Sequence, residues 1–218
     1  MNFKAVLFDL DGTLVDSVID VANAMNQVLL NNNFPIHPAT DYIDMIGDGM
    51  ENLVTKSLPE ENRTKTFIRK CFSEMKATYS TMWMNNTQLY PGIAELLTSL
   101  NERNIKLAIL SNKPHNFAQL IADKLLAGWN FDVVMGLSDG SLRKPDPTSA
   151  LAIASQINLD SAYFIYIGDS VTDIKTAINA GMYPVGVSWG YRSTSSLIES
   201  GAKLIIHKPK DILSLFEN

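Results

Sequence analysis

The stretch at residues 5–17, AVLFDLDGTLVDS, joins a run of apolar residues to two aspartates, a glycine and a threonine. Its first residues are large or β-branched and apolar, which is typical of a short strand buried on both faces. Side chains alternate along a strand, so we expect Asp9 and Asp11 to point the same way where the chain leaves the sheet. Gly12 leaves room for a ligand near the main chain, and the Thr13 hydroxyl can hold a neighbouring carboxylate. A strand followed by an ordinary Asp-Gly turn is the alternative interpretation.

The rest of the chain alternates short apolar runs with segments of helical spacing. Further strands are predicted at residues 105–110, 131–135, 163–167, 183–187 and 203–206. Helices are predicted between them at residues 93–103, 116–126, 148–155, 171–180 and 195–200. Strict alternation favours an α/β fold with a Rossmann-like parallel sheet and helices on both faces. Such a sheet binds its ligands beyond the carboxyl ends of its strands.

Residues 16–83 interrupt this alternation directly after the first strand. Their apolar residues recur at helical spacing, and no segment reads convincingly as a strand. We predict an all-helical insertion of about four helices there. The α/β core then comprises residues 1–15 and 84–218.

Composition limits the possible partners and the location of the protein. The 218 residues carry a net charge of −5, which argues against a nucleic-acid or anionic membrane surface. The single cysteine, Cys71, excludes an internal disulfide and suits a reducing cytosol. Asp9 and Asp11 break the first apolar run before a secretory signal could form, and no run is long enough to span a bilayer. We therefore expect a cytoplasmic protein, as a monomer or a homodimer, without nucleic-acid or membrane partners.

Three further stretches with polar residues follow predicted strands and so belong at the same sheet edge. The first is SNKP at 111–114, where the Ser111 hydroxyl and backbone N–H groups before a helix suit phosphate oxygens. A simple helix cap at Ser111 or Asn112 is the alternative. The second is RKPDP at 143–147, where prolines stiffen the backbone that carries Lys144. Its alternative is a solvated lysine in a rigid loop.

A third such stretch, GDSVTD at residues 168–173, ends a predicted strand and starts a helix. It places Asp169 at the strand end and Asp173 one helical turn later, although a capped helix with an acid in its first turn explains the same residues. At an effective dielectric of about 20, two unit charges about 4 Å apart interact by roughly 4 kcal/mol. Asp9, Asp11 and Asp169 would therefore be hard to keep ionised together without a cation. Mg²⁺ suits an all-oxygen site of this kind, with Lys144 balancing charge on the far side.

At this point the sequence resembles the haloacid dehalogenase superfamily of phosphotransferases over nearly its whole length. The matching motifs, in chain order, are DLDGT at 9–13, Ser111, Lys144 and GDSVTD at 168–173. The insertion after the first motif is similar to the helical cap that this superfamily carries there. LSNKP at 110–114 and VSWGY at 187–191 are most similar to the phosphoglycolate phosphatase-like subgroup. Members of that subgroup also act on other small phosphate esters.

The resemblance implies a role for each matching acid. Asp9 would attack phosphorus and carry the phosphoryl group as an aspartyl-phosphate. Asp11 would protonate the leaving oxygen and then activate the hydrolytic water. Mg²⁺ would be held by the Asp9 carboxylate, the Asp11 main-chain carbonyl and Asp169. Asp173 would support these ligands.

The resemblance also implies a phosphate site and a cap function. Ser111, Asn112 and Lys144 would bind phosphate oxygens, and Gly12 would let the phosphate approach the main chain. The cap would close over the leaving group and exclude water. Its stretch at residues 47–49, which is Gly47, Asp48 and Gly49, resembles the substrate-specificity loop of the subgroup. An ordinary turn between helices is the alternative for that stretch.

These inferences predict a Mg²⁺-dependent phosphatase that acts on a small phosphorylated metabolite. The nearest alternative is a sugar phosphomutase of the same fold, in which the aspartyl-phosphate passes to a second hydroxyl. Thr13 favours hydrolysis mildly, since such mutases often carry valine there. A non-catalytic switch or binding module that uses a phospho-aspartate is a further alternative. The helical insertion and the acid at Asp11 count against it, because a switch needs neither a lid nor a leaving-group acid.

Overall fold

The computed structural model describes residues 2–216, and these form two compact units. The first unit runs to Val15 and resumes at Leu89, and the second comprises residues 16–88. The chain therefore crosses between the units twice. Each unit has its own buried apolar residues.

The first unit contains a six-stranded parallel sheet, as predicted. Its strands are β1 (Ala5–Phe8), β4 (Lys106–Pro114), β5 (Val133–Leu137), β6 (Phe164–Gly168), β7 (Tyr183–Val187) and β8 (Leu204–Ile206). They lie in the order β5-β4-β1-β6-β7-β8, and every neighbouring pair is parallel. The chain order reverses on either side of β1, so the carboxyl ends of β4, β1 and β6 meet at the switch point where such sheets bind ligands.

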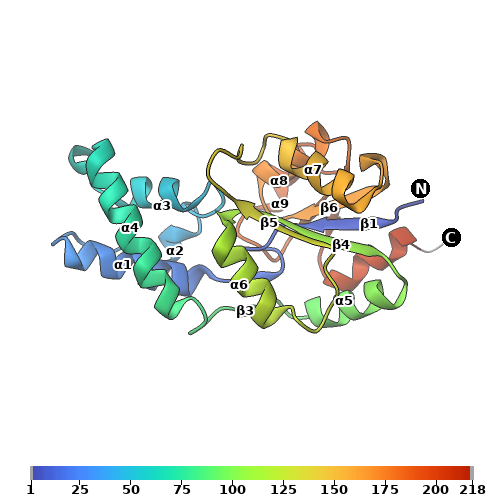
Figure 1. Ribbon diagram of the computed structural model, residues 1–218, viewed down its shortest axis with the longest axis horizontal. Helices are drawn as coiled ribbons and strands as arrows, with labels where there is room; N and C mark the ends of the chain where they lie inside the picture. The colour runs from blue at the N-terminus through green and yellow to red at the C-terminus, as the bar shows by residue number, and fades with distance from the viewer. Residues whose placement is uncertain (1, 217–218) are drawn as a thin grey trace. The chain divides into compact units, whose positions relative to one another are not determined.

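Helices cover both faces of this sheet (Figure 1). They are α5 (Ile93–Glu102), α6 (His115–Leu125), α7 (Thr148–Ile157), α8 (Val171–Asn179) and α9 (Thr194–Glu199), with short 3-10 turns η2 (Ser161–Tyr163) and η3 (Pro209–Phe216). In the view of Figure 1, α7 and α8 lie above the sheet and α5 and α6 lie below it. Right-handed connections between parallel strands require this two-sided arrangement.

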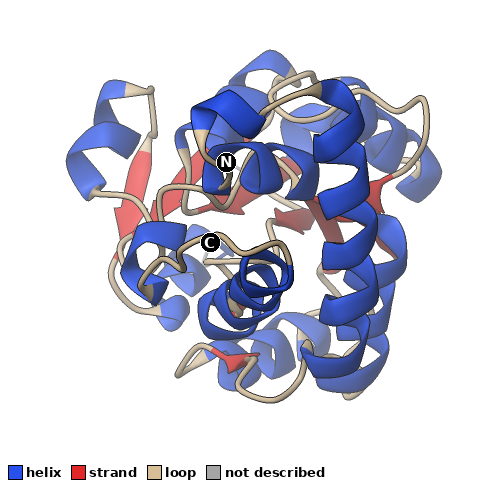
Figure 2. Ribbon diagram, turned by 90° about the vertical axis from the view of Figure 1, so that its left-hand side faces the viewer, coloured by secondary structure: helices blue, strands red, loops and turns tan. Residues whose placement is uncertain are grey.

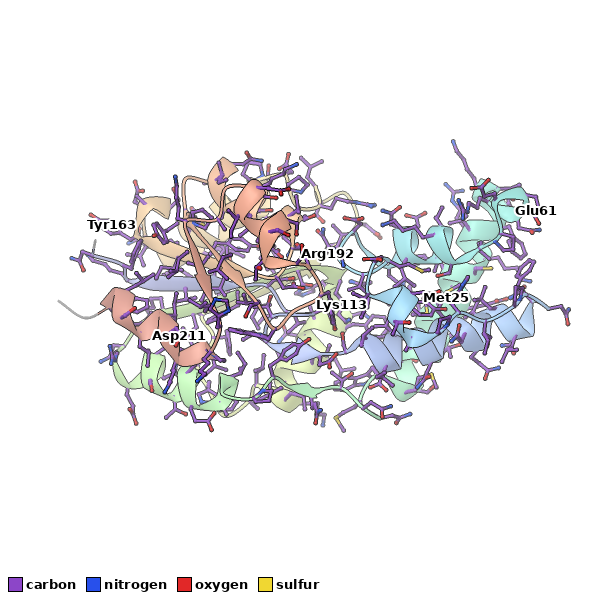
Figure 3. All side chains as sticks on the ribbon, turned by 180° about the vertical axis from the view of Figure 1, so that it is seen from behind. Met25, Glu61, Lys113, Tyr163, Arg192 and Asp211 are labelled. Atoms are coloured by element: carbon purple, nitrogen blue, oxygen red, sulfur yellow. The ribbon has the colours of Figure 1, made fainter. Side chains whose placement is uncertain are left out.

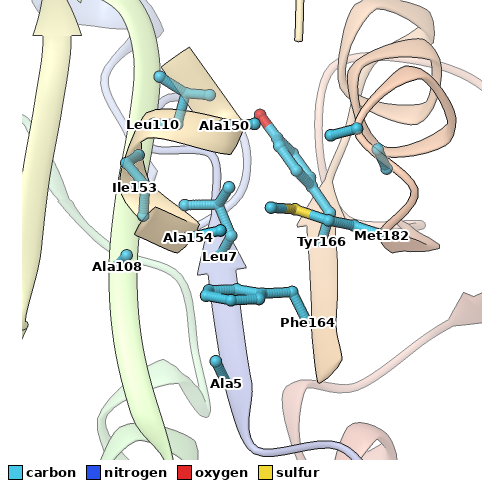
Figure 4. Close-up of a cluster of buried hydrophobic side chains, with 12 residues drawn as sticks. Ala5, Leu7, Ala108, Leu110, Ala150, Ile153, Ala154, Phe164, Tyr166 and Met182 are labelled. Atoms are coloured by element: carbon cyan, nitrogen blue, oxygen red, sulfur yellow. The ribbon is translucent and has the colours of Figure 1, made fainter. Parts of the chain in front are cut away.

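The core against α7 explains why the first strand reads as an uninterrupted apolar run (Figure 4). Leu7 is fully buried and packs in one cluster with Phe164 of β6 and Ile153 of α7. All four residues of β1 are buried, since helices cover both sheet faces. The usual alternation of apolar and polar residues is therefore absent from this strand.

The main difference from the sequence prediction concerns β4. We expected this strand to end at residue 110, but it continues to Pro114, which pairs with Leu137 after an irregularity that follows Leu110. Consequently Ser111 and Asn112 lie on the strand, and the alternative of a helix cap at either residue is wrong. Helix α6 begins at His115, after Pro114.

The second unit consists mainly of helices, which Figure 2 shows in blue. They are α1 (Val18–Asn31), α2 (Ala39–Tyr42), α3 (Met50–Ser57) and α4 (Lys65–Met82), with the 3-10 turn η1 (Glu60–Asn62). Two-residue strands, β2 (Val15–Asp16) and β3 (Gln88–Leu89), pair where the chain crosses between the units. The sequence did not reveal them, because two residues are too few for an alternation pattern. Within residues 2–216, none of the helices combines the length and apolar content that crossing a bilayer demands.

A buried aspartate joins the two ends of the helical unit. Asp20, in the first turn of α1, is fully buried. Its carboxylate accepts hydrogen bonds from the backbone N–H groups of Asn86 and Thr87, from the Asn86 side-chain amide and from the Thr87 hydroxyl, at 2.7–3.0 Å. Burial alone would raise the pKa of Asp20, but these donors outweigh it and lower the pKa. The structure therefore stabilises the ionised form.

We expect Asp20→Asn to destabilise the helical unit by about 2 kcal/mol at pH 7, because an amide nitrogen then faces backbone donors. A lowered carboxyl pKa contributes stability above its unfolded value of about 3.9 and loses it as the pH falls through the folded value. The deficit should therefore shrink below about pH 4. Urea unfolding of both proteins across pH measures it. Asp41→Asn, at an exposed position in the same unit, is the control. Equal losses from the two substitutions would contradict this role of Asp20.

Candidate active site

A buried lysine connects the end of the first strand with the start of α8. Asp9 directly follows β1, Lys144 lies in the loop after β5, and Asp173 lies in the first turn of α8. Lys144 Nζ is 2.8 Å from Asp9 Oδ1 and 2.6 Å from Asp173 Oδ1. Asp9 is 7% exposed, Lys144 is 5% exposed and Asp173 is 0% exposed. Three segments that are distant along the chain therefore meet at one ammonium group.

The position of Lys144 depends on the neighbouring strand β4. Its backbone N–H donates to Asn112 Oδ1 at 2.9 Å, and Asn112 Nδ2 donates to the Lys144 carbonyl oxygen at 3.3 Å. Lys144 Nζ also donates to the Leu110 carbonyl oxygen at 3.1 Å. The Asn112 amide was predicted to bind phosphate oxygens, and the Asn112 side chain binds the main chain that carries the lysine.

Asp173 combines two functions that we had treated as alternatives. Its Oδ2 accepts from the backbone N–H of Ser170 at 3.1 Å, and its own N–H donates to Ser170 Oγ at 3.2 Å. This reciprocal pair is a capping box that fixes the start of α8. Its other oxygen meets Lys144, and the Tyr166 hydroxyl lies 3.4 Å from that oxygen. The helix start therefore aims the carboxylate at the site.

Asp169 is held from three directions just after β6. The backbone N–H of Tyr191 donates to its Oδ2 at 2.7 Å. The Thr13 hydroxyl donates to Oδ1 at 3.4 Å, which agrees with the expectation that this hydroxyl holds a neighbouring carboxylate. Gly12 has a φ of +82°, and a Cβ at Gly12 or Gly190 would collide with Asp169. Only glycine permits this approach of backbone to carboxylate at Gly12.

Three carboxylates form the acidic cluster of the site, namely Asp9, Asp169 and Asp173. One oxygen of each lies within 4.8 Å of the others, and all three residues are buried. Asp173, which was expected only to support the ligands, therefore belongs to the cluster together with Asp9 and Asp169. The Asp11 side chain is not a member of this cluster.

The electrostatics follow from burial and from this crowding. Burial, followed by the charge of Asp173, raises the pKa of Asp9 well above its ordinary value, and the same two causes raise the pKa of Asp169 to about 7. Burial alone would lower the pKa of Lys144, but the charges of Asp173 and Asp9 raise it well above its ordinary value. Lys144 is therefore cationic at neutral pH, while the cluster still lacks enough positive charge to keep every carboxylate ionised.

The side chain of Asp11 has a lysine partner of its own. Lys113 Nζ lies 2.9 and 3.0 Å from its two oxygens, and both side chains are largely buried. Ser111 is buried on β4, where its Oγ accepts from the backbone N–H of Lys113 at 3.1 Å. We did not predict a role for Lys113. The alternation of side chains along a strand could have indicated such a role. Lys113 is two residues beyond Ser111 on an extended strand, so both side chains are expected on the same face.

The predicted specificity residues of the helical unit lie in a turn before α3. Gly47 and Gly49 have φ values of 115° and 91°. Asp48 between them forms an exposed ion pair with Lys56, at 2.9 Å. The alternative of a turn between helices therefore describes the local backbone, and Asp48 presents its carboxylate at the surface of its unit.

Comparison with known proteins adds a family to this geometry. The family model described as haloacid dehalogenase-like hydrolase matches residues 6–187. The phosphoglycolate phosphatase of Psychrobacter arcticus is 33% identical over 199 residues, which cover 88% of this chain and 86% of the relative. That of Salmonella choleraesuis is 28% identical and covers 97% of this chain and 92% of its own.

Solved structures resemble the fold over its whole length. A haloacid dehalogenase-like family hydrolase from Streptococcus pneumoniae superimposes with a TM-score of 0.88 at 26% identity. The match covers 99% of each chain. It therefore includes both the α/β unit and the helical unit.

Proposed function

Because this chain belongs to the haloacid dehalogenase-like hydrolases and is a phosphoric monoester hydrolase, we propose that it is a Mg²⁺-dependent phosphatase for a small phosphorylated metabolite. Phosphoglycolate, named in the curated relatives, is the first candidate substrate, with related monoesters next. The observation that carries the proposal is the Lys144 ammonium between Asp9 and Asp173. It supports a site that handles several negative charges at one point, as phosphoryl transfer requires.

In the first half of the reaction we assign Asp9 as the nucleophile. One of its oxygens forms a bond to phosphorus while the bond from phosphorus to the leaving oxygen breaks, which leaves an aspartyl-phosphate. Asp11 donates its proton to the leaving oxygen, so that a neutral alcohol departs. Lys144 stabilises the negative charge near Asp9 throughout.

In the second half a water molecule attacks phosphorus. Asp11, now a carboxylate, takes a proton from that water as the bond between phosphorus and Asp9 breaks. Inorganic phosphate leaves, and both aspartates return to their starting forms. The Ser111 hydroxyl and the backbone around Gly12 are assigned to the phosphate oxygens in both halves.

The donor set of the acidic cluster fits Mg²⁺. Asp9, Asp169 and Asp173 offer only oxygen ligands, which this hard cation prefers, and the raised pKa of Asp169 indicates that the cluster needs more positive charge. We assign its ligands as the Asp9 and Asp169 carboxylates and the Asp11 main-chain carbonyl, supported by Asp173. When bound, Mg²⁺ would neutralise negative charge on the phosphate oxygens.

For the helical unit we propose the role of a cap that excludes water and selects the leaving group. Residues 16–88 form a compact unit with its own core, which suits a body that moves as a whole. Gly47 and Gly49 flank Asp48 with backbone angles that favour glycine, and they remain our candidates for the specificity loop.

The proposed function predicts a simple assay result. Purified protein with Mg²⁺ should release inorganic phosphate from 2-phosphoglycolate, as measured by molybdate colour. Removing the metal with EDTA should silence the reaction, and added Mg²⁺ should restore it. Ca²⁺ should substitute poorly, because its larger and looser coordination misplaces the nucleophile.

Alternative substrates decide between the related functions. Sugar phosphates, nucleotides and pyrophosphate belong in the same screen. Conversion of a hexose 1-phosphate to its 6-phosphate without phosphate release would favour the mutase. Background turnover on every ester, with or without Mg²⁺, would contradict the proposed function.

A further inference from the structure

Lys113 is a buried cation that the mechanism above does not use. Its side chain is 5% exposed, and Nζ contacts both oxygens of Asp11. Among residues 2–216, Lys113 and Lys144 are the buried cationic residues. Lys113 lies at the carboxyl end of β4, where Figure 3 labels it. A second buried cation in one site needs an explanation, because burying a charge is costly unless a partner of opposite charge compensates for it.

The backbone of Lys113 is held firmly at this strand end. Its N–H donates to Ser111 Oγ, and its carbonyl oxygen faces Gly136 of β5. A Cβ at Gly136 would lie 2.7 Å from that oxygen, so only glycine lets the two strands approach this closely. The ammonium group is therefore carried by a fixed piece of main chain.

The Lys113 ammonium lies near the position that the leaving group would occupy in the proposed reaction. Asp11, as the proton donor, must lie within hydrogen-bond reach of the leaving oxygen. Lys113 Nζ is 2.9 Å from Asp11 Oδ1, so the ammonium and the leaving oxygen are separated by at most two hydrogen bonds in series, roughly 6 Å. In an ester of a 2-hydroxy acid, a single carbon separates the leaving oxygen from the carboxylate. Such a carboxylate therefore falls within reach of Lys113.

The other buried lysine shows that one ammonium can serve two carboxylates in this site. Lys144 Nζ donates to Asp9, to Asp173 and to the Leu110 carbonyl oxygen, which accounts for its three N–H groups. A substrate carboxylate would therefore displace an existing contact at Lys144. Lys113 is the other buried ammonium, and it contacts Asp11, the assigned proton donor.

We propose that Lys113 is a specificity-determining residue that binds a carboxylate on the leaving group while it keeps its contact with Asp11. The inference rests on the proposed phosphatase function and narrows its substrate class to phosphate esters of 2-hydroxy acids. The net charge of −5 makes a local cation necessary for so negative a substrate.

The test compares two esters that differ at one group. 2-Phosphoglycolate and 2-hydroxyethyl phosphate share the reacting phosphate and the first carbon, but only the former carries a carboxylate. We expect the wild-type protein to prefer 2-phosphoglycolate in kcat/KM. Lys113→Met should lower that preference by about 10- to 100-fold, which is the usual value of a hydrogen bond to a charged group. Most of this change should appear in KM, because the carboxylate is remote from the reacting phosphorus.

The ratio of kcat/KM for the two esters shows whether Lys113 binds the substrate carboxylate or only positions Asp11. If Lys113 only positions Asp11, the substitution will slow both esters equally and the preference will not change, which overturns the proposal. Lys106→Met is the matched control: it removes another ion-paired lysine of β4, whose side chain is 49% exposed, and it should leave the preference unchanged.

The wild-type comparison can overturn the proposal even if Lys113→Met does not fold. Equal kcat/KM for the two esters would overturn this proposal and leave the phosphatase function intact. Turnover of neither ester would instead count against the proposed function with these substrates. A clear preference for 2-phosphoglycolate that disappears in the variant supports Lys113.

Discussion

The substitution Asp9→Asn is expected to lower phosphatase turnover by roughly 10⁴-fold or more, because it replaces the carboxylate that attacks phosphorus with a neutral amide, which is a poor nucleophile. Asparagine is nearly isosteric, and its carbonyl oxygen can still accept a hydrogen bond from Lys144. The loss should therefore appear in kcat while the protein stays folded. Steady-state phosphate release, with circular dichroism as a check on folding, measures both.

The thermal stability of Asp9→Asn tests the effect of the Asp9 charge on folding. Burial and Asp173 raise the pKa of Asp9, so its charge works against folding at neutral pH in the absence of metal. We expect Asp9→Asn to melt at least as high as the wild type in EDTA. Asp139→Asn, in an exposed loop, is the control and should leave turnover unchanged. Substantial residual activity in Asp9→Asn would remove Asp9 as the nucleophile.

Lys144→Met should be the most destabilising single change in the site, at about 3–5 kcal/mol, because it leaves two buried carboxylates without their cation. Turnover should also fall, by roughly 10³-fold, since the charge near the transferring phosphate is lost. A raised lysine pKa gives stability that is complete below the unfolded value of about 10.4 and is lost above the folded value. The deficit should therefore be full at pH 7, where urea unfolding measures it.

Lys106→Met tests whether burial causes this loss. Lys106 also forms a short ion pair, at 2.7 Å to Asp132, but its side chain is half exposed. Exposed pairs contribute at most about 1 kcal/mol, so the control should lose little. Similar losses from the two substitutions would show that ion pairing alone, and not the buried cluster, explains Lys144.

The location of the site could be predicted from local patterns. An apolar run that ends in Asp9 places its carboxylate at the edge of a parallel sheet, and the same argument places Asp169 after β6. The sheet then brings these residues together, because β4 and β6 lie on either side of β1. These are short-range signals that a strand carries within a few residues.

The partners of these side chains could not be predicted in the same way. Asp11 and Lys113 are 102 positions apart, and their contact depends on the register of β1 against β4. The family resemblance implied only a supporting role for Asp173, and a capped helix was the alternative explanation of its position. Its second oxygen contacts Lys144, which is carried by the loop after β5. Contacts of this kind follow from three-dimensional proximity, for which spacing along one chain gives no measure.

The paired hydrogen bonds between Asn112 and the main chain of Lys144 bear on how such a site could be rebuilt elsewhere. The loop after β5 carries Lys144, and the Asn112 side chain on β4 holds its main chain in place. Neither segment positions the lysine without the other. Grafting the lysine loop onto another parallel sheet would deliver the charge without its direction. A designer would have to transfer both pieces together with the spacing between their strands.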